Sequence, residues 1–398
     1  MSNLRCLIIA HGEERGHSGY KQRALAMAQH LEELGYRPVV LWFSRLVGLF
    51  GYRLQWQTAC INIPMPPFCS VHIAVCRVTR FLSRLLTRIV IVLFHIDVAV
   101  AEGATAAAIG ARHGIPVICD FQGDIVEELK LVSASQWQVR LVQEDELLAC
   151  REAVGWVCVS DALAQVLRGR HGAAAPAAVV PCGVDIRKFA GYEERRERAR
   201  ARLGVSDRWV VCYLGGLHKY QQIPRTLSLV GAMRAREPRL FFLFLTQDAS
   251  DSYAPELSVL GDEGRDYARL ALTHSEVVEL LPAADLGLLL RAPSPVNYVS
   301  SPTKCGEYLA SGVPVLTTAH AGDAPRIVSE TNTGLVLHGE TDAPDVAELA
   351  LSFLQTIMAN RADVATRSHL AARRYHDSLR GRENLGSLFR ELIAGSLR

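Results

Sequence analysis

Short apolar runs alternate with longer helical patterns along most of this sequence, and this alternation restricts the fold more than any other feature. Runs such as CLIIA, VVLWF and VICD each end at a loop, and amphipathic stretches such as YKQRALAMAQHLEELG lie between them. Strands and helices that alternate in this way are typical of parallel sheets with helices on both faces. The pattern therefore predicts an α/β fold.

The alternation is interrupted once, by the charged stretch RKFAGYEERRERARARLGVSDR, and it resumes afterwards. A chain of 398 residues is long enough for two domains, each with its own core. We therefore predict a first domain over residues 1–183, a connector over 184–205 and a second domain over 206–375. A helix over 376–398 is expected to follow, with the option of packing back on the first domain.

Composition excludes several classes of protein. Hydrophobic residues make up 49% of the chain and charged residues 21%, which is typical of a globular protein rather than a disordered one. The net charge of +2 gives no general attraction to nucleic acid. The ten cysteines include no C-x-x-C pair, so buried thiols in a reducing compartment are favoured over disulfides or zinc ligands. We expect no metal site.

The stretch CRVTRFLSRLLTRI indicates attachment to a membrane surface, because it places four arginines on one side of a helix, beside apolar residues. These arginines are Arg77, Arg80, Arg84 and Arg88. Basic amphipathic helices bind anionic membranes, but an ordinary surface helix shows the same pattern when its apolar residues enter the core. No apolar run reaches the ~20 residues of a spanning helix. We expect a cytoplasmic protein, with the option of attachment at the inner face of a membrane through these arginines.

Open parallel sheets bind ligands at the carboxyl ends of their strands, so the loops after the expected strands are the candidate sites. The loop YLGGLHKYQQ follows a strand of the second domain, and its Gly215 and Gly216 would let a ligand approach the backbone closely. The chain contains neither G-x-G-x-x-G nor G-x-x-x-x-G-K-[ST], which argues against a dehydrogenase and against a P-loop NTPase.

The stretch SPTKCGEYLASGVPVLTT begins with residues that start a helix. Ser301 suits the N-cap and Pro302 the first position, and the free amides there favour an anion. Lys304 adds a positive charge, and Glu307, one turn further on the same face, is placed to accept hydrogen bonds from a ribose. The simpler interpretation is a surface Lys–Glu pair worth about 0.2–0.5 kcal/mol, and the spacing alone does not choose between the two.

Two further cations favour the anion site over the surface pair. Arg291 ends the apolar strand LGLLL at the edge where ligands bind, and Lys219 follows the glycine pair. Both can converge with Lys304 on one anion. The carboxylates of DFQGDIVEE, by contrast, have no histidine near them, so solvated or helix-capping roles are expected for most of them.

Together these stretches resemble the retaining GT-B glycosyltransferases, specifically glycosyltransferase family 4. Besides SPTKCGEYLASGVPVLTT, the likeness rests on VVPCGVD, YLGGLHKYQQ, DFQGDIVEE and GHSGYKQRALAMAQHLEELGY. The resemblance implies two doubly wound Rossmann-like domains facing a central cleft, with a nucleotide-sugar in the second and an acceptor in the first. It also implies metal-independent transfer of a hexose, with retention and without a cofactor, to a glycan or lipid-linked acceptor, as in polysaccharide biosynthesis.

The expected site residues divide between the two domains. In the second, Lys219 and Lys304 are expected to stabilise the departing diphosphate, and the donor is expected to contact Gly215, Gly216, Arg291, Ser301, Thr303 and Glu307. In the first, cations near the start of a helix, including Arg23, could meet an acceptor phosphate. The expected acceptor residues are His17, Gly19, Lys21, Gln122 and Gly123.

The sequence departs from the family pattern at five positions, one of which is Cys182 of VVPCGVD, where the family has an asparagine. The family's first glutamate would fall at Val299, its phosphate-binding arginine at Gly216 and its lysine near Gln221, and Gln122 replaces a histidine. These departures leave two alternatives open. One is a catalytically degenerate scaffold that binds a nucleotide-sugar within a glycosylation complex, and the other is a nucleotide-sugar epimerase of the same fold.

Overall fold

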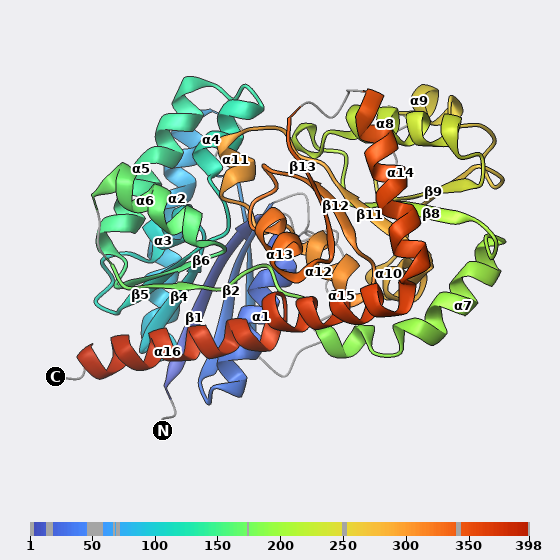
Figure 1. The fold of residues 1–398 in the computed structure, drawn as a ribbon. Coiled ribbons are helices and arrows are strands. Elements are labelled where there is room, and N and C mark those ends of the chain that lie inside the picture. The colour runs from blue at the N-terminus through green and yellow to red at the C-terminus, as the bar shows by residue number, and fades with distance from the viewer. Residues whose placement is uncertain are drawn as a thin grey trace. The chain divides into compact units, whose positions relative to one another are not determined.

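The computed structural model describes residues 4–12, 19–45, 59–66, 68, 72–172, 175–248, 253–339 and 344–396. The chain divides into two compact units: unit 1 is Met1–Pro181 with Arg380–Arg398, and unit 2 is Cys182–Leu379. Each unit contains one parallel sheet with helices along its connections (Figure 1). The predicted α/β architecture with two doubly wound sheets is confirmed.

The sheet of unit 1 has the strand order β3-β2-β1-β4-β5-β6-β7. Leu7 of β1, for example, lies opposite Val39 of β2 and Ala99 of β4. The inner strands β4 and β5 are buried along their whole length and are mostly apolar, as expected when both faces of a sheet are covered. The strands are β1 (Arg5–Gly12), β2 (Arg37–Arg45), β3 (Ala59–Met65), β4 (Val98–Glu102), β5 (Val117–Phe121), β6 (Gly155–Cys158) and β7 (Ala177–Val179).

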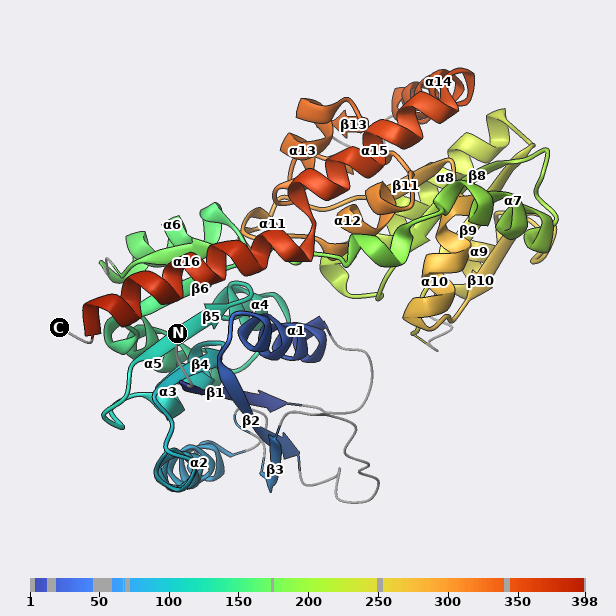
Figure 2. The same cartoon turned by 90° about the horizontal axis from the view of Figure 1, so that it is seen from below.

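The last helix of the chain completes unit 1. Leu385, Leu388 and Phe389 of this helix are buried in one cluster with Ile8 of β1 and Leu31 of the first helix. It runs along unit 1 in both views (Figures 1 and 2). The helices of this unit are α1 (Gly19–Glu33), α2 (Ile73–Leu93), α3 (Ala104–Gly110), α4 (Ile125–Leu131), α5 (Gln136–Glu152), α6 (Asp161–His171) and α16 (Ser378–Ser396).

The sheet of unit 2 has the order β10-β9-β8-β11-β12-β13. Its strands are β8 (Trp209–Leu214), β9 (Leu240–Leu245), β10 (Tyr267–Leu270), β11 (Leu286–Leu289), β12 (Val315–Thr318) and β13 (Gly334–Leu337). Its helices are η2 (Ile186–Phe189), α7 (Tyr192–Leu203), η3 (Lys219–Gln221), α8 (Ile223–Arg236), α9 (Ala254–Ser258), α10 (His274–Leu280), η4 (Leu281–Ala283), α11 (Pro295–Tyr298), α12 (Thr303–Ala310), α13 (Ala324–Thr331), α14 (Pro344–Ala359) and α15 (Arg361–Tyr375).

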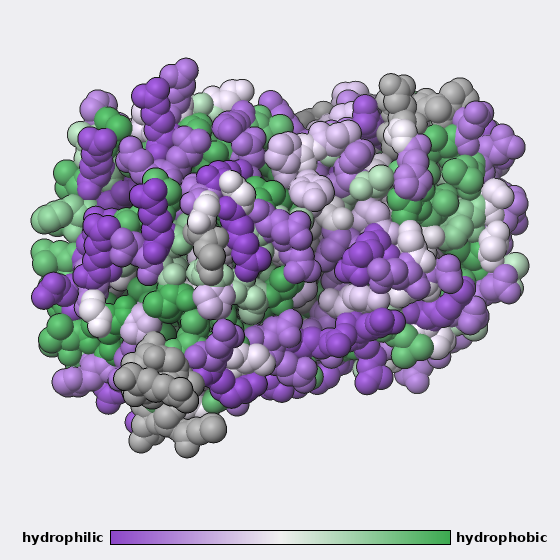
Figure 3. All heavy atoms as spheres, turned by 60° about the vertical axis from the view of Figure 1, so that its left-hand side comes forward, coloured by the Kyte–Doolittle hydropathy of each residue, from purple (hydrophilic) through white to green (hydrophobic). Residues whose placement is uncertain are grey.

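The cysteines and the hydropathy of the helices can be compared with what the sequence predicts. The cysteines in the described ranges are free, and most are buried, as the sequence predicts. Within the same ranges, no helix combines the length and the apolar content needed to cross a bilayer. On the face drawn in Figure 3, hydrophilic residues cover most of the surface and hydrophobic residues form smaller patches between them.

The segment 184–205, which the sequence predicts to be a connector, packs as part of unit 2. It forms η2 and α7, and Ile186 and Phe189 are buried in the unit 2 core. The arginines of α7 are not simply solvated, because Arg196 and Arg200 bind the fully buried carboxylate of Asp285. A run of charges is typical of a solvated linker, but here a buried acid just before β11 binds two of the arginines and holds the segment on unit 2.

Asp285→Ala should destabilise unit 2 strongly. Asp285 also accepts a 2.8 Å hydrogen bond from the backbone N–H of Val210, so its removal leaves two arginines without their carboxylate and one amide without its acceptor. Breaking a buried ion pair typically costs ~3–5 kcal/mol. Urea unfolding followed by circular dichroism should show that the free energy of unfolding decreases by an amount of that order.

Glu279→Ala is the matched control for Asp285→Ala. Glu279 pairs with Arg195 of the same helix, α7, but its carboxylate is about half exposed. Exposed pairs contribute about 0–1 kcal/mol, so this variant should unfold nearly as the wild type does. If the free energy of unfolding decreased equally in the two variants, Asp285 would not stabilise unit 2 through a buried ion pair.

Candidate functional site

The strands β8 and β11 end side by side in the unit 2 sheet. They pair in parallel, with Gly287 opposite Cys212, so their following loops leave from the same edge. Gly215 and Gly216 follow β8 directly, and Arg291 comes two residues after β11. The strand order reverses here, because β9 lies on the other side of β8. Such reversal points are where open parallel sheets bind ligands.

Helix α12 directs Lys304 to this point. The Lys304 side chain lies in the first turn of the helix, and the residue is only 8% exposed. Its Nζ donates to Oε1 of Gln221 at 2.6 Å and to Oη of Tyr213 at 3.1 Å. Burial, followed by repulsion from Arg291, lowers the pKa of Lys304 well below its ordinary value. The ammonium group therefore lies at the end of β8, in contact with the loop that follows it.

Arg291 is the second buried cation at this edge, and the residue is 6% exposed. Its backbone is fixed by Thr318, which accepts from its N–H at 2.9 Å and donates to its carbonyl at 2.8 Å. Its guanidinium group lies 4.9 Å from the ring centre of Tyr220 and donates to the Tyr220 carbonyl at 3.4 Å. The buried Nε has no hydrogen-bond partner in the described part of the chain.

Neither of these two buried cations is paired with a carboxylate in the described part of the chain. Neither Lys304 nor Arg291 forms an ion pair with any residue in the described ranges, and burial lowers the pKa of Arg291 as it does that of Lys304. Burying a charge without a counterion is costly, because the charge gives up its hydration. An anion bound at this edge would supply the missing negative charge.

The glycine pair makes room for the Lys304 side chain. Gly215 has a φ of +132°, and a Cβ atom there would lie 2.4 Å from Nζ of Lys304. Any other residue at this position would therefore have to displace the lysine. The carbonyl of Gly216 accepts a 2.6 Å hydrogen bond from Oη of Tyr213, which places the second glycine in the same network.

Glu307 does not form the surface pair with Lys304 that the spacing allowed. Its side chain is largely buried, and its Oε1 lies 3.4 Å from Nδ1 of His274. The lysine instead turns inward toward Gln221. The i,i+3 spacing was compatible with an ion pair, but the polar groups of η3 and β8 provide closer partners for the ammonium group.

The expected N-cap role of Ser301 is wrong. Helix α12 begins at Thr303 with Pro302 in the cap position, and no side chain caps it. Ser301 donates instead to Oδ2 of Asp323 at 3.3 Å, and burial raises the pKa of Asp323 to about 6. Because proline has no side-chain acceptor, the first amides of α12 are left without a side-chain cap, and Thr303 is exposed beside them.

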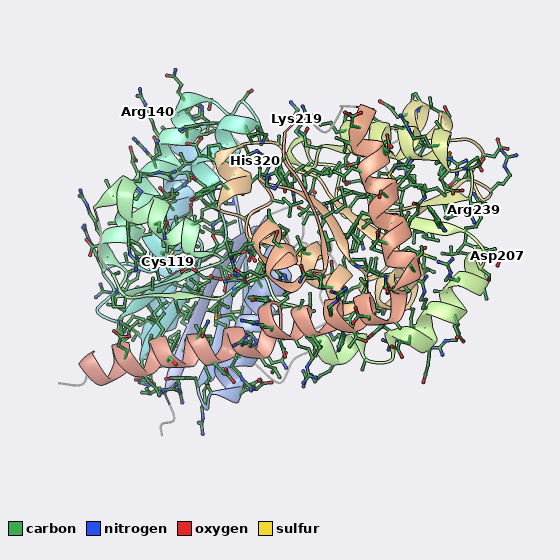
Figure 4. The ribbon with its side chains drawn as sticks, in the orientation of Figure 1. Cys119, Arg140, Asp207, Lys219, Arg239 and His320 are labelled. Carbon is green, nitrogen blue, oxygen red and sulfur yellow. The ribbon has the colours of Figure 1, made fainter. Side chains whose placement is uncertain are left out.

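Lys219 is not brought into direct contact with the two buried cations. It begins η3, its side chain is exposed (labelled in Figure 4), and it makes no side-chain hydrogen bond or ion pair with the residues described. Its neighbours Tyr220 and Gln221 hold Arg291 and Lys304 instead. Gln221 was not among the residues expected to contact Lys304, although it follows Lys219 by only two positions.

In unit 1, the loop after β5 carries Gln122 and Gly123. Nε2 of Gln122 donates to Oε2 of Glu102, at the end of β4, at 2.5 Å. Burial, followed by the charge of Asp120, raises the pKa of Glu102 well above its ordinary value. A Cβ atom at Gly123 would lie 2.9 Å from Oε1 of Glu128, so a side chain there would displace that carboxylate.

Two carboxylates of this loop, Asp120 and Asp124, are buried rather than solvated. Asp120 is fully buried and binds Arg23 through two hydrogen bonds of 2.6 and 2.7 Å. Arg23, expected near an acceptor phosphate, is therefore paired within unit 1. Asp124 caps α4 as expected but is also buried and paired with Arg170.

The remaining predicted acceptor residues are His17, Gly19 and Lys21. Gly19 is the first residue of that helix. His17 lies outside the described residues, and the side chain of Lys21 does so as well. These residues stay predictions.

Comparison with known proteins gives the same family that the motifs suggested. Residues 18–188 match the family described as Glycosyltransferase Family 4. Over 233 residues the chain is 26% identical to the putative teichuronic acid biosynthesis glycosyltransferase TuaC of Bacillus subtilis (strain 168). That match covers 58% of this chain and 54% of TuaC, so the chain spans about half the length of this curated relative.

Solved structures match nearly the whole chain. Anabaena HepE in complex with UDP is similar with a TM-score of 0.70 and 17% identity, covering 96% of this chain and 99% of HepE. WaaG, a glycosyltransferase involved in lipopolysaccharide biosynthesis, is similar with a TM-score of 0.71 and 14% identity, covering 95% of this chain and 98% of WaaG. The chain has the GT-B fold of these proteins, and its residues 18–188 resemble family 4. Both the fold and the resemblance expected from the sequence are confirmed.

Lys304→Met tests whether this chain holds Lys304 as a poorly compensated cation. An unfolded lysine is protonated below about pH 10, whereas the folded chain lowers the pKa of Lys304. In the window between the two pKa values the unfolded state binds more protons, so the wild type loses stability as the pH falls. Methionine is uncharged and of similar length. We therefore expect a higher Tm for Lys304→Met, with a difference that widens as the pH decreases.

Lys219→Met serves as the control for this measurement, because it removes an exposed lysine only two residues from Gln221. Its Tm should follow that of the wild type at every pH. If Lys304→Met melted below the wild type throughout the pH range, the ammonium group would be a net stabilising contact, and the interpretation as an uncompensated cation would be wrong.

Proposed function

We propose that this chain is a glycosyltransferase that moves a hexose from a nucleoside diphosphate sugar to a glycan or lipid-linked acceptor, with retention of the anomeric configuration. The observation that carries the proposal is the pair of buried cations, Lys304 and Arg291, at the strand-order reversal of unit 2. A diphosphate would neutralise both. HepE, which has a similar fold, has been solved with UDP and with UDP-glucose, and this favours a uridine nucleotide as the donor.

The cations would act mainly on the leaving group. As the bond between the sugar and the diphosphate breaks, negative charge grows on the departing phosphate oxygens. Fixed cations and the uncapped amides of α12 would stabilise that charge more strongly than they stabilise the ground state. The exposed Lys219 would approach the same phosphates from η3, and the reaction would need neither a metal ion nor a cofactor.

The arrangement accounts for two departures from the family pattern. Near Gln221, where the family has a lysine, the glutamine amide oxygen receives the ammonium group of Lys304 instead. The cation would thus be supplied by α12 rather than by the loop after β8. At Val299, the family's first glutamate is replaced by a buried apolar side chain. We propose that Glu307 alone accepts the ribose hydroxyls, beside His274.

The relatives favour a glycan as the acceptor. TuaC is described as a teichuronic acid biosynthesis enzyme and WaaG as a lipopolysaccharide biosynthesis enzyme. We propose that this chain likewise acts in polysaccharide biosynthesis, in the cytoplasm at the inner face of a membrane. Gln122 and Gly123 at the end of β5, with the start of α1, would contact the acceptor.

The proposal is tested by turnover with a panel of UDP-, GDP- and ADP-hexoses and with soluble and lipid-linked glycan acceptors. We expect transfer from one donor class, with kcat reduced about 10²–10³-fold in Arg291→Ala and Lys304→Ala, the range found when a charge-stabilising group is removed. Arg239→Ala, which removes an exposed arginine of unit 2, should leave kcat unchanged.

The other outcomes of this experiment identify the alternatives. Nucleotide binding without transfer to any acceptor would favour the scaffold. Conversion of the donor sugar without an acceptor would favour the epimerase. A chain that binds no nucleotide would refute the donor site altogether.

Glu307→Ala should weaken binding of the nucleoside diphosphate while the fold survives. Losing a hydrogen bond to a charged group typically costs ~1.5–3 kcal/mol, so we expect Kd from isothermal titration calorimetry to rise by one to two orders of magnitude. Glu330→Ala removes an exposed carboxylate from the same unit and should leave Kd unchanged. An unchanged Kd in a folded Glu307→Ala protein would remove Glu307 from the donor site.

A further inference from the structure

Helix α2 presents its polar side chains to unit 1 and its apolar side chains outward. The buried residues of α2 are Cys76, Thr79, Arg80, Ser83, Thr87, Val90 and Ile91. The large apolar residues that are 40–67% exposed are Val75, Val78, Phe81, Leu82, Leu85, Ile89, Val92 and Leu93, which together we call the apolar face of α2. A surface helix of a soluble domain normally has the opposite orientation.

A buried ion pair fixes this orientation. Nη2 of Arg80 lies 2.6 Å from Oδ2 of Asp145 in α5, and Thr105 of α3 donates to the same oxygen at 2.8 Å. The expected outward stripe of four arginines is therefore wrong at Arg80. Rotating the apolar face inward would break this pair and leave Asp145 buried without its main counterion, which is strongly unfavourable.

The other three arginines of the predicted stripe lie beside the apolar face. Arg77, Arg84 and Arg88 are exposed and share a strip between the buried side and the apolar face, at about 100° per residue around the helix. They form no ion pair within the described ranges, and Nε of Arg84 donates to the Ala108 carbonyl at 3.1 Å. The sequence of α2 contains no acidic residue. The outward surface is thus apolar along its centre and positively charged along one side.

We propose that α2 lies in the surface of an anionic lipid bilayer, with its apolar face among the acyl chains and Arg77, Arg84 and Arg88 at the lipid phosphates. Figure 2 shows α2 end-on at the outer edge of unit 1. Helices of this kind enter the headgroup boundary by about 5–10 Å without spanning the membrane. Charge complementarity identifies the occupant, because phosphates match the arginine strip.

A second copy of the chain fits this face less well. In a symmetric pair the same surface meets itself, so two arginine strips would approach each other without an acidic residue of α2 to neutralise them. The proposal deepens the proposed function, since a lipid-linked acceptor lies in the same bilayer. It does not require turnover, because membrane binding can be measured without donor or acceptor.

The test is sedimentation of the full chain with vesicles of phosphatidylcholine, with and without phosphatidylglycerol. We expect stronger binding to the anionic vesicles. Val78→Ser/Phe81→Ser/Leu85→Ser should weaken binding to both by about tenfold or more, because it removes apolar area from exposed positions. Arg77→Gln/Arg88→Gln should weaken binding to anionic vesicles alone, by about fivefold per arginine.

Two further proteins make the test specific. Val259→Ser/Leu349→Ser/Leu370→Ser removes three exposed apolar residues of unit 2 and should bind vesicles as the wild type does. In Phe81→Trp, the indole should emit at shorter wavelength on binding and be quenched by lipids brominated in the acyl chains. Every variant should keep the wild-type Tm, because the altered residues are exposed.

Several results would overturn the proposal. These are wild-type protein that binds neither vesicle, binding that survives the triple serine substitution in α2, and an unquenched tryptophan at position 81. A wild-type dimer that the serine substitutions dissociate, without vesicle binding, would assign the face to a second copy instead. Vesicle binding without sugar transfer would refute the proposed reaction and leave this proposal standing, and transfer without vesicle binding would do the reverse.

Discussion

The contact between the ammonium group of Lys304 and the side chains of Gln221 and Tyr213 holds the candidate site together. It joins helix α12, the turn η3 and strand β8, which are separate in the sequence. It also explains why position 215 is a glycine, since any Cβ atom there would occupy the space of the lysine. Arg291 is drawn to the same point by Tyr220, the residue next to Gln221, so one short loop after β8 positions both cations. The donor site proposed here depends on this single junction.

The ion pair of Arg80 and Asp145 has a comparable role in unit 1. In unit 2, the unpaired cations Lys304 and Arg291 favour the binding of an anion. In unit 1, Arg80 is paired inside the protein, and this pair directs the apolar residues of its own helix outward. Both arrangements follow from the cost of leaving a buried charge unpaired. In unit 2 the chain provides no counterion for the cations, which predicts an anionic ligand. In unit 1 the chain provides no cover for the apolar face of α2, which predicts a lipid surface.

The sequence predicted the architecture well because the strands are buried on both faces and are therefore mostly apolar, as β4 and β5 show. It also predicted correctly that Gly215 and Arg291 follow strands and that Lys304 lies in the first turn of a helix, because such positions can be recognised by local pattern. It did not predict the partners of Lys304, since the direction of a long side chain depends on residues more than 80 positions away. The same limit applies to α2. Its periodicity revealed two faces, but only Asp145, 65 positions from Arg80, decides which face is inside. The segment 184–205 was predicted to be a connector for an equivalent reason. The carboxylate that binds its arginines belongs to Asp285, which lies far from the segment along the chain.

The position of α16 has a consequence for how the chain is made. Leu385, Leu388 and Phe389 belong to the core of unit 1, yet they follow the whole of unit 2 in the sequence. On the ribosome, the earlier part of unit 1 therefore emerges before α16 can cover its side of that core. Unit 2, a continuous segment from Cys182 to Leu379, can complete its own core before that helix appears. Although domains generally fold from the N-terminus onward during translation, the later-synthesised unit of this protein is the first whose core can be complete.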